Sequence, residues 1–434
     1  MAVIDELIDF LNYSKSEYHA CAYIKRELKN NGFIELNESE VFNLKLGDKY
    51  FITRNESSII AFTIPNNLDN IGFNITSAHL DSPTLKLKPN PLFIKNGYYC
   101  LDTEVYGGLI YSSFTDRVFD ISGRVFIKNE NRIESKLFSF DKGMVSIPNL
   151  CIHFNREINK GFSYNPQENL IPILSRVEKE LDFNDLLAKK INVKKDNVLS
   201  FDLGLSLIDR AKLFGINNEF ISSPQIDNLM SSFGLYKSLI NSIGKNINVL
   251  ALFNNEEIGS KTRCGALSDF LINTLNRILN NLKIKEEQKQ IIYSNSFMIS
   301  ADNAHGFHPL YSNYYDIINS SYLNNGVVIK NNVRGNYTTD GLSLAIFKEL
   351  ANKAKIKYQY FSNRSDISGG STLGALSLEK LSIPTVDIGL PQLAMHSSCE
   401  MAGSADIIDL IEVIKLFYSV KINKIDDSNY NIGG

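Results

Sequence analysis

The part of the chain after Asp227 alternates between helical and strand patterns, and this alternation constrains the fold more than any other feature. The patterns follow one another at residues 229–243, 247–253, 267–284, 296–301, 341–354, 358–362, 372–381 and 385–388, with a last helix from about Ser404. Strands that alternate with helices are typically buried between helical layers in a largely parallel sheet. The sequence therefore predicts an α/β fold with a three-layer α/β/α domain.

A second region interrupts this domain. From about residue 92 to 219 the sequence contains many short β patterns and few candidate ligands. Pro89 and Pro91 break regular structure and favour a linker before it. A chain of 434 residues is also long for one compact domain. We therefore expect an inserted β-rich domain at residues 91–222, with the two parts of the layered domain at residues 1–90 and 223–434.

Composition narrows the class of protein. The chain is 44% hydrophobic and 21% charged with a formal net charge of −3, which is typical of a soluble globular protein and gives no reason to expect nucleic acid or a membrane surface as a partner. No secretory pattern and no bilayer-length apolar run is visible. The five scattered cysteines fit reduced thiols. We expect a cytoplasmic protein.

Two adjacent carboxylates, Glu256 and Glu257, follow the apolar strand pattern of residues 247–253. Carboxylates at the end of a buried strand are costly unless something pairs with them. Neighbouring side chains in an extended chain point to opposite sides, so one glutamate could face a bound cation and the other the substrate. Taken alone, two solvated glutamates explain the pair equally well.

Further candidates lie at strand or helix ends, where ligands gather in open α/β sheets. His79 and Asp81 would share one strand face, so Asp81 could orient His79, although a surface pair is the commoner explanation. Asp227 opens a helix, where capping is its ordinary role. Asp302 follows an apolar strand, and His396 lies in a loop before the last helix.

Taken together, five of these residues have the chemistry of metal ligands. They are His79, Asp227, Glu257, Asp302 and His396. Nitrogen and oxygen ligands without a thiolate suit two Zn²⁺-like ions, each with one histidine and one terminal carboxylate, and with one carboxylate bridging. Such a centre activates water and polarises a carbonyl group. Glu256 then remains as general base and proton shuttle.

These segments resemble the M18 family of metalloaminopeptidases, the aspartyl aminopeptidase and aminopeptidase I group. The matching stretches include SAHLDSPTLKLKPNP, EVYGG, CIHFNR, IDNL, NNEEIGS, SADNAHGFHP and GLPQLAMHSSCEMAG, between residue 77 and about residue 403. The resemblance implies an aminopeptidase that uses two divalent ions, Zn²⁺ first and Mn²⁺ or Co²⁺ as alternatives. It also implies that the inserted domain mediates dimerisation and that dimers assemble into a dodecamer.

The resemblance also assigns roles to single residues. His79 and Asp302 would hold one ion, Glu257 and His396 the other, and Asp227 would bridge them. Glu256 would be the base, with Asp81 orienting His79.

Three further residues are assigned by the resemblance alone. His153 would reach the active site of the neighbouring subunit and contact the oxyanion or the substrate; a metal ligand is a less favoured role, and a packed histidine is the simpler alternative. Lys330 and Tyr337 match positions near the pocket for the first side chain of the substrate. A lysine there would pair with an acidic side chain, although neutral N-terminal residues remain an alternative.

Two other functions fit the same residues. A two-metal N-acyl amino-acid deacylase could use this ligand set, and a non-enzymatic scaffold shell could share the fold. The complete set of ligands with a base argues against the scaffold, because a scaffold requires none of it. We favour the peptidase acting on peptide substrates, with the deacylase as an alternative that uses the same ligands.

Overall fold

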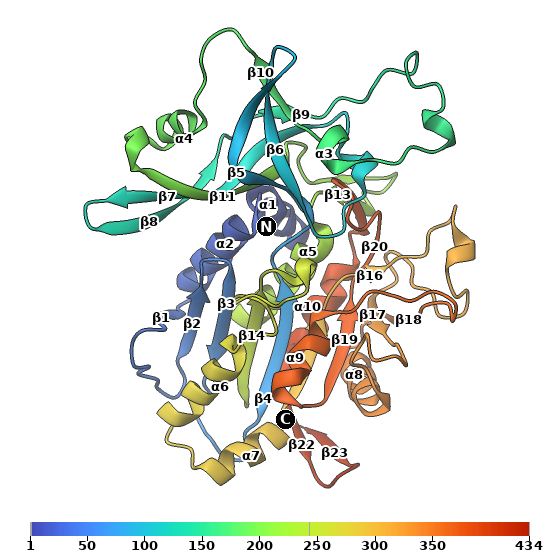
Figure 1. Ribbon diagram of the computed structural model, residues 1–434. Helices are drawn as coiled ribbons and strands as arrows, with labels where there is room; N and C mark the ends of the chain where they lie inside the picture. The colour runs from blue at the N-terminus through green and yellow to red at the C-terminus, as the bar shows by residue number, and fades with distance from the viewer. Residues whose placement is uncertain (1, 243, 434) are drawn as a thin grey trace.

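The chain folds as a mixed α/β protein, seen in a computed structural model that describes residues 2–242 and 244–433. A nine-stranded sheet runs through the lower part of the molecule in Figure 1, and a seven-stranded sheet lies above it. The α/β class predicted from the alternating patterns is confirmed. In the part of the chain that the structure describes, no helix combines the length and the apolar composition needed to cross a membrane.

The nine-stranded sheet positions the site. In their order across the sheet its strands are β1 (Ile34–Leu36), β2 (Lys49–Arg54), β3 (Ser58–Thr63), β14 (Ile247–Phe253), β4 (Phe73–His79), β15 (Phe297–Ala301), β19 (Thr385–Gly389), β17 (Val327–Lys330) and β18 (Tyr358–Phe361). The central strands β14, β4, β15 and β19 are parallel, whereas β3 and β17 are antiparallel to their central neighbours. Because parallel strands end at one edge, the segments that follow β4, β14 and β15 meet there.

Apolar side chains cover both faces of this sheet. Along β3, Ile59 and Ala61 belong to one buried cluster and Ile60 and Phe62 to the other, as the two-residue period of a strand requires. The first cluster is completed by α1 (Val3–Tyr13), α2 (Glu17–Asn30), α5 (Ile226–Ile240), α8 (Gly341–Ala354) and α10 (Asp406–Ser419). The second is completed by α6 (Phe270–Asn281), α7 (Glu286–Ser294) and α9 (Leu373–Leu381).

The seven-stranded region, residues 84–207, has its own core. Its strands lie in the order β11 (Val198–Leu207), β5 (Thr84–Lys95), β6 (Tyr98–Tyr106), β10 (Ile173–Arg176), β9 (Val145–Ser146), β7 (Val118–Asn129) and β8 (Arg132–Ser139). Two helices, α3 (Pro166–Asn169) and α4 (Phe183–Ile191), accompany them.

Smaller sheets complete the fold. A five-stranded sheet contains β12 (Lys212–Phe214), β13 (Phe220–Ser223), β21 (Glu400–Gly403), β20 (Pro391–Leu393) and β16 (Ala304–His305), and a hairpin contains β22 (Lys421–Lys424) and β23 (Tyr430–Gly433).

The expected linker around Pro89 and Pro91 is wrong, because both prolines lie inside strand β5. The pairing of β5 with β6 is interrupted between Leu87 and Leu92. Proline lacks the amide hydrogen that a regular ladder needs, and an interruption of this kind tolerates it.

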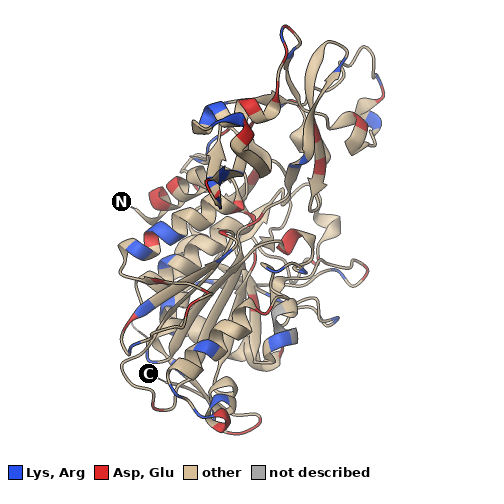
Figure 2. Ribbon diagram, turned by 60° about the vertical axis from the view of Figure 1, so that its left-hand side comes forward, with Lys and Arg blue, Asp and Glu red and all other residues tan. Residues whose placement is uncertain are grey.

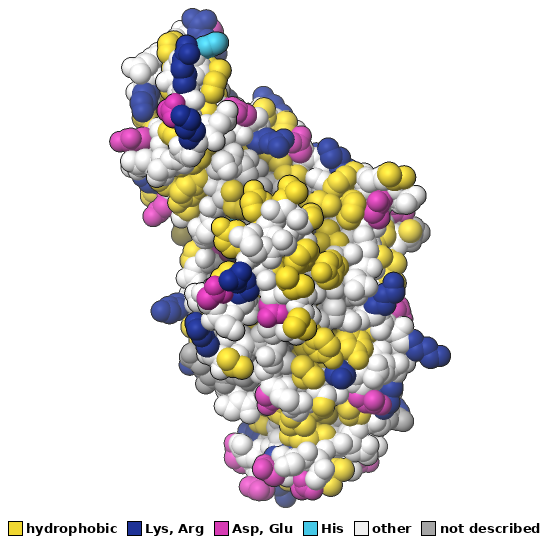
Figure 3. Space-filling model, turned by 90° about the vertical axis from the view of Figure 1, so that its right-hand side faces the viewer, with side chains coloured by type: hydrophobic (Ala, Val, Ile, Leu, Met, Phe, Trp, Pro, Cys, Tyr) yellow, Lys and Arg dark blue, Asp and Glu magenta, His cyan; other side chains and the backbone are white. Residues whose placement is uncertain are grey.

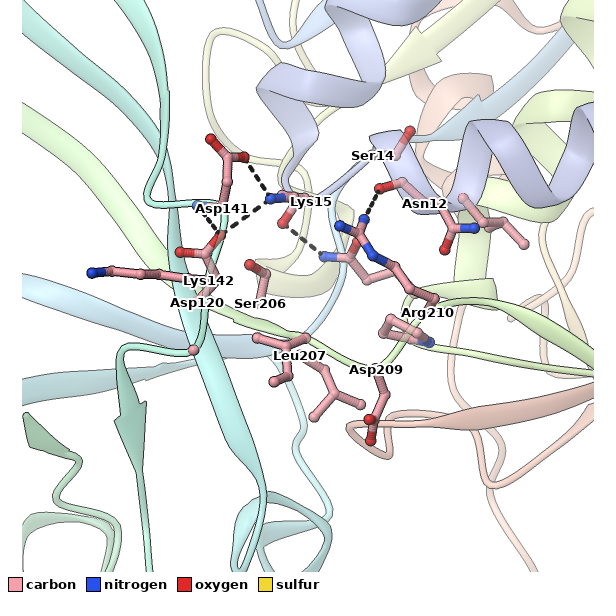
Figure 4. A pocket seen from close by; sticks show the side chains of 15 residues that line it. Asn12, Ser14, Lys15, Asp120, Asp141, Lys142, Ser206, Leu207, Asp209 and Arg210 are labelled. Atoms are coloured by element: carbon pink, nitrogen blue, oxygen red, sulfur yellow. Dashed lines mark hydrogen bonds and ion pairs between the residues drawn. The ribbon is translucent and has the colours of Figure 1, made fainter. Parts of the chain in front are cut away.

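Lys15, in the turn between α1 and α2, connects the helices that cover the nine-stranded sheet to the seven-stranded region. Its ammonium group donates hydrogen bonds to Asp120 (3.2 Å), Ser139 (2.7 Å) and Asp141 (2.9 Å) of the seven-stranded region. Figure 4 shows this lysine at the edge of a cavity of about 230 Å³. Figure 2 shows that basic and acidic residues are interspersed along the ribbon in both parts of the molecule, in keeping with the near-neutral net charge.

Candidate metal centre and active site

Three neighbouring strands deliver site residues to one edge of the nine-stranded sheet. His79 is the last residue of β4 and pairs in register with Phe253, the last residue of β14. Glu256 and Glu257 follow in a short 3-10 turn, η4 (Glu256–Ile258), and Asp302 comes directly after β15. The strand order therefore brings these side chains together.

The two remaining predicted ligands approach from outside these strands. Asp227 lies in the first turn of α5, where its backbone is not helical, and the residue at the cap position of this helix is Gln225. One of its carboxylate oxygens, Oδ1, is buried without a hydrogen-bond partner among the described residues. His396 lies between β20 and β21 with a φ of +66°.

Asp227 lies between the two histidines. Its Oδ1 is 3.6 Å from Nε2 of His79, and its Oδ2 is 3.6 Å from Nε2 of His396. Asp302 Oδ1 is 3.7 Å from Nε2 of His79, and Glu257 Oε2 is 3.5 Å from Nε2 of His396. Each histidine thus shares a small space with one oxygen of Asp227 and one oxygen of a further carboxylate.

These residues fit bound zinc. Ligand atoms about 2.0–2.1 Å from a tetrahedral ion lie roughly 3.3 Å from one another, close to the separations here. Asp227 Oδ1 and Glu257 Oε1 are buried and have no hydrogen-bond partner among the described residues. Buried carboxylates without partners are costly, and cations would satisfy them. The donor set contains nitrogen and oxygen only, which zinc accepts.

The electrostatics of the cluster support this fit. Burial, together with the negative charge of Asp227, raises the pKa of Glu257 well above its ordinary value. Burial and three neighbouring aspartates raise the pKa of Glu256 to about 8, against the opposing effect of His79. Burial lowers the pKa of His79, but the nearby carboxylates of Asp227, Asp302 and Asp81 outweigh it and leave this pKa well above the ordinary value. The protein thus buries several acidic groups together, and a bound cation would favour their ionised forms.

Asp81 organises the turn that carries the two glutamates. Its carboxylate accepts hydrogen bonds from the amides of Glu256 and Glu257, both at 3.2 Å, and from the Tyr106 hydroxyl at 2.7 Å. The ring of His79 lies nearer to the backbone carbonyl of Asp81, at 3.0 Å from Nδ1, than to its carboxylate, at 3.5 Å. The closest contact of Asp81 with His79 is therefore made by its main chain.

The expectation that Glu256 and Glu257 point to opposite sides is wrong. They lie in the turn η4 and not in an extended strand, so the alternation of a strand does not apply. Oxygens of both glutamates and a ring nitrogen of His79 all lie within 4.8 Å of one another. Both side chains therefore face the same space.

His396 is held by two groups far from it in sequence. Its Nδ1 is 2.8 Å from the carbonyl oxygen of Gly108 in the seven-stranded region, which leaves Nε2 directed at Asp227 and Glu257. Its amide donates to Glu400 at 2.8 Å. Such supporting groups fix the orientation of a metal-ligating histidine.

Sequence reasoning assigned no role to these supporting residues. Tyr106 and Gly108 stand in the stretch EVYGG and Glu400 in the stretch after His396, but their contacts are made across long separations in the chain. The only sequence feature that could have indicated these supporting residues is their place in stretches that resemble the family.

The three residues that the resemblance added lie in two places. His153 is exposed in the seven-stranded region and belongs to none of the metal-binding groups formed by the described residues. Lys330 is buried, with its ammonium group 3.5 Å from Asp302 Oδ2 and 5.3 Å from the ring of Tyr337. Lys330 and Tyr337 therefore adjoin the cluster within this chain, and His153 does not.

A set of nitrogen and oxygen donors that could hold a metal ion, with a carboxyl group beside it at the strand ends of an α/β sheet, is typical of a metal-dependent hydrolase. Comparison with known proteins identifies the family. The family model described as "Aminopeptidase I zinc metalloprotease (M18)" matches residues 10–418. The "Probable M18 family aminopeptidase 2" of Clostridium novyi is 41% identical over 425 residues, covering 96% of this chain and 98% of that protein.

Solved structures have the same fold. A chain from the cryo-EM structure of the Ape4 and Nbr1 complex is 33% identical with a TM-score of 0.93, covering 96% of this chain and 85% of that chain. The S. cerevisiae mApe1 dodecamer is 24% identical with a TM-score of 0.85, covering 96% of both chains. The chain belongs to the M18 family, and it is a zinc metalloprotease of the aminopeptidase type. The predicted family and enzyme class are confirmed.

Proposed function

We propose that the protein is a dinuclear zinc aminopeptidase that removes N-terminal residues from peptides. One observation carries the proposal: the two oxygens of Asp227 each approach a different histidine, as a carboxylate bridging two ions would. His79 and Asp302 would hold one ion, and Glu257 and His396 the other. Zinc is the expected metal, with Mn²⁺ and Co²⁺ as alternatives.

The proposed chemistry divides the neighbouring glutamates. Zinc bound by these residues supplies Lewis acidity that makes water nucleophilic at neutral pH and polarises the scissile carbonyl. Glu256 takes the proton of the attacking water and delivers it to the leaving amine. Asp81 fixes the position of Glu256 for this transfer through the hydrogen bond to its amide. Glu257 serves as a ligand.

We propose that the preferred N-terminal residue is acidic, with neutral residues as the alternative. Lys330 is buried beside Asp302 and Tyr337, so its charge is poorly solvated. An acidic side chain would offset that desolvation through a charge-assisted hydrogen bond, which a neutral side chain cannot do. Relative kcat/KM for aspartyl, glutamyl, leucyl and alanyl substrates measures this preference.

The proposed assembly is a dodecamer built from dimers, and the solved mApe1 fold neighbour is a dodecamer. In it, residues 91–222 form an inserted β-rich dimerisation domain on an α/β/α catalytic domain, and His153 contacts substrate in the neighbouring subunit. Figure 3 shows hydrophobic side chains gathered on one face of the molecule. Exposed apolar residues near η5 (Ser312–Tyr314) include Leu310, Ile317 and Ile318. Exposed apolar surface of this kind supports self-association.

We propose that the protein is located in the cytoplasm.

Glu256→Gln tests the catalytic assignment. The variant keeps the shape of the side chain and all five proposed ligands, so we expect two bound zinc ions per chain and a kcat at least about a hundredfold lower. Glu257→Gln is the matched neighbour: it should lose zinc as well as activity. Near-normal turnover by Glu256→Gln would overturn the role of Glu256.

Substrate form separates the peptidase from a deacylase. Hydrolysis of a free-amine aminoacyl substrate is compared with hydrolysis of its N-acetylated form. We expect the free amine to be preferred, and a preference for the blocked form would favour the deacylase.

A further inference from the structure

Glu400 lies behind the proposed metal centre without facing it. Its side chain belongs to the first residue of β21 and is 3% exposed. Oε2 accepts a hydrogen bond from the amide of Asp227 at 2.9 Å, and Oε1 accepts one from the amide of His396 at 2.8 Å. One carboxylate thus joins the main chain of the proposed bridging ligand to that of the second histidine, 169 residues further along the sequence.

A chain of buried amides fixes the direction of these bonds. The side-chain NH₂ group of Gln392 donates to Glu400 Oε1 at 3.2 Å, and the side-chain oxygen of Gln392 accepts from the side chain of Asn303 at 2.6 Å. Asn303 also donates to the carbonyl oxygen of Ile226 and accepts from the hydroxyl of Ser231. Because the side-chain NH₂ group of Gln392 donates to Glu400, the side-chain oxygen of Gln392 is left to accept from Asn303, so the hydrogen bonds along this chain have consistent directions.

The arrangement parallels that of Asp81. Asp81 accepts from the amides of Glu256 and Glu257, and Glu400 accepts from those of Asp227 and His396. Each buried carboxylate therefore fixes two neighbouring points of the centre through the backbone. His396 needs such a hydrogen bond to its backbone more than His79 does. His396 lies in a loop, whereas the backbone of His79 is held by a strand of the sheet.

Resting on the proposed dinuclear site, we infer that Glu400 is a positioning residue that holds Asp227 and His396 at the spacing needed for the ion on the His396 side. It acts through the two amides and touches neither substrate nor ion. Its loss weakens binding of that ion and leaves the ion held by His79 and Asp302 in place.

Glu400→Gln is the first test. Its amide group can accept from one of the two backbone amides, but its NH₂ group must then face the other donor. Zinc affinity is measured by competition with a chromophoric chelator, which gives two dissociation constants for the wild-type protein. We expect the weaker constant to rise about ten- to a hundredfold and the tighter one to change less than threefold.

Asp406→Asn is the matched control. Asp406 is 1% exposed and accepts from the amides of Asn324 and Gly326, both at 2.8 Å, away from the metal centre. This variant should keep both zinc constants. An equal loss of zinc in Asp406→Asn would show a general effect on folding and overturn the inference.

Glu400→Asp distinguishes the effect of side-chain length from the effect of charge. It also provides the test if the Glu400→Gln variant does not fold. The shorter side chain keeps its charge but cannot reach both amides, so we expect the same selective loss. Wild-type zinc constants in either Glu400 variant would overturn the inference and leave the proposed function intact. A wild-type protein that binds fewer than two ions would contradict the proposed function itself.

Discussion

The two histidines of the proposed centre are supported in different ways. His79 ends a central strand, with β14 and β15 on either side, and its side chain is 1% exposed. His396 lies in a loop with a positive φ, and its side chain is 31% exposed. The sheet holds the first, whereas hydrogen bonds to Gly108 and Glu400 hold the second.

This difference shows that the position of a site residue in the fold determines how many additional contacts it needs. A histidine inside a hydrogen-bonded ladder keeps its place with few additional contacts. A histidine in a loop needs partners from distant segments, and here one partner comes from the seven-stranded region. We therefore expect the His396 side of the centre to be the more easily disturbed, and the following variants test that expectation.

Histidine removal should give the largest contrast in stability. In metal-free protein, His79→Ala removes a buried neighbour that lies within 4 Å of the carboxylates of both Asp227 and Asp302. We expect the free energy of unfolding to fall by about 3 kcal/mol. His396→Ala acts at a partly exposed position and should cost less than about 1 kcal/mol. Urea denaturation measures both, and equal losses would remove the proposed distinction.

Tyr106→Phe tests the support of the glutamate turn. It deletes the hydroxyl group that donates to Asp81, and Asp81 in turn holds the amides of Glu256 and Glu257. We expect kcat to fall about tenfold, as for other supporting partners of metal sites.

Tyr18→Phe is the control for this variant. Tyr18 is buried to a similar degree and donates to Asp202 at 3.2 Å, away from the metal centre. It should keep a normal kcat, and equal kinetic losses in the two variants would argue against a specific role for Tyr106.

Gly107→Ala should have the smallest effect. At Gly107, with a φ of +77°, an added Cβ would lie 3.1 Å from Cβ of Glu257. The contact should displace Glu257 slightly and weaken zinc binding a few-fold on the His396 side. Gly97→Ala has a similar φ of +85° and nothing within 4 Å, so it carries the same backbone strain alone. Matching zinc affinities in the two variants would contradict the prediction.

Much of the layered fold could be predicted because local patterns determine it. The strand predicted at residues 247–253 is β14, and the helix predicted at residues 341–354 is α8. The prediction of a linker at Pro89 and Pro91 was wrong. A proline indicates a break in strand pairing, but it does not determine whether the strand also ends there.

The site could be predicted where a residue type that binds metal stands at the end of a predicted strand. His79 and Asp302 lie at such ends, and the structure places them beside Asp227. The roles of Asp81, Tyr106 and Glu400 depend on hydrogen bonds between segments far apart in sequence. No periodicity encodes those contacts.

Stepwise removal of metal from the wild-type protein tests the central claim most directly. Zinc-loaded protein is dialysed against increasing concentrations of chelator, and bound zinc per chain is measured by atomic emission. The account predicts two ions, of which the one on the His396 side leaves first, so that His396→Ala begins at about one ion and lacks the first step. A single ion in the wild-type protein, or loss of both ions in one step, would contradict it.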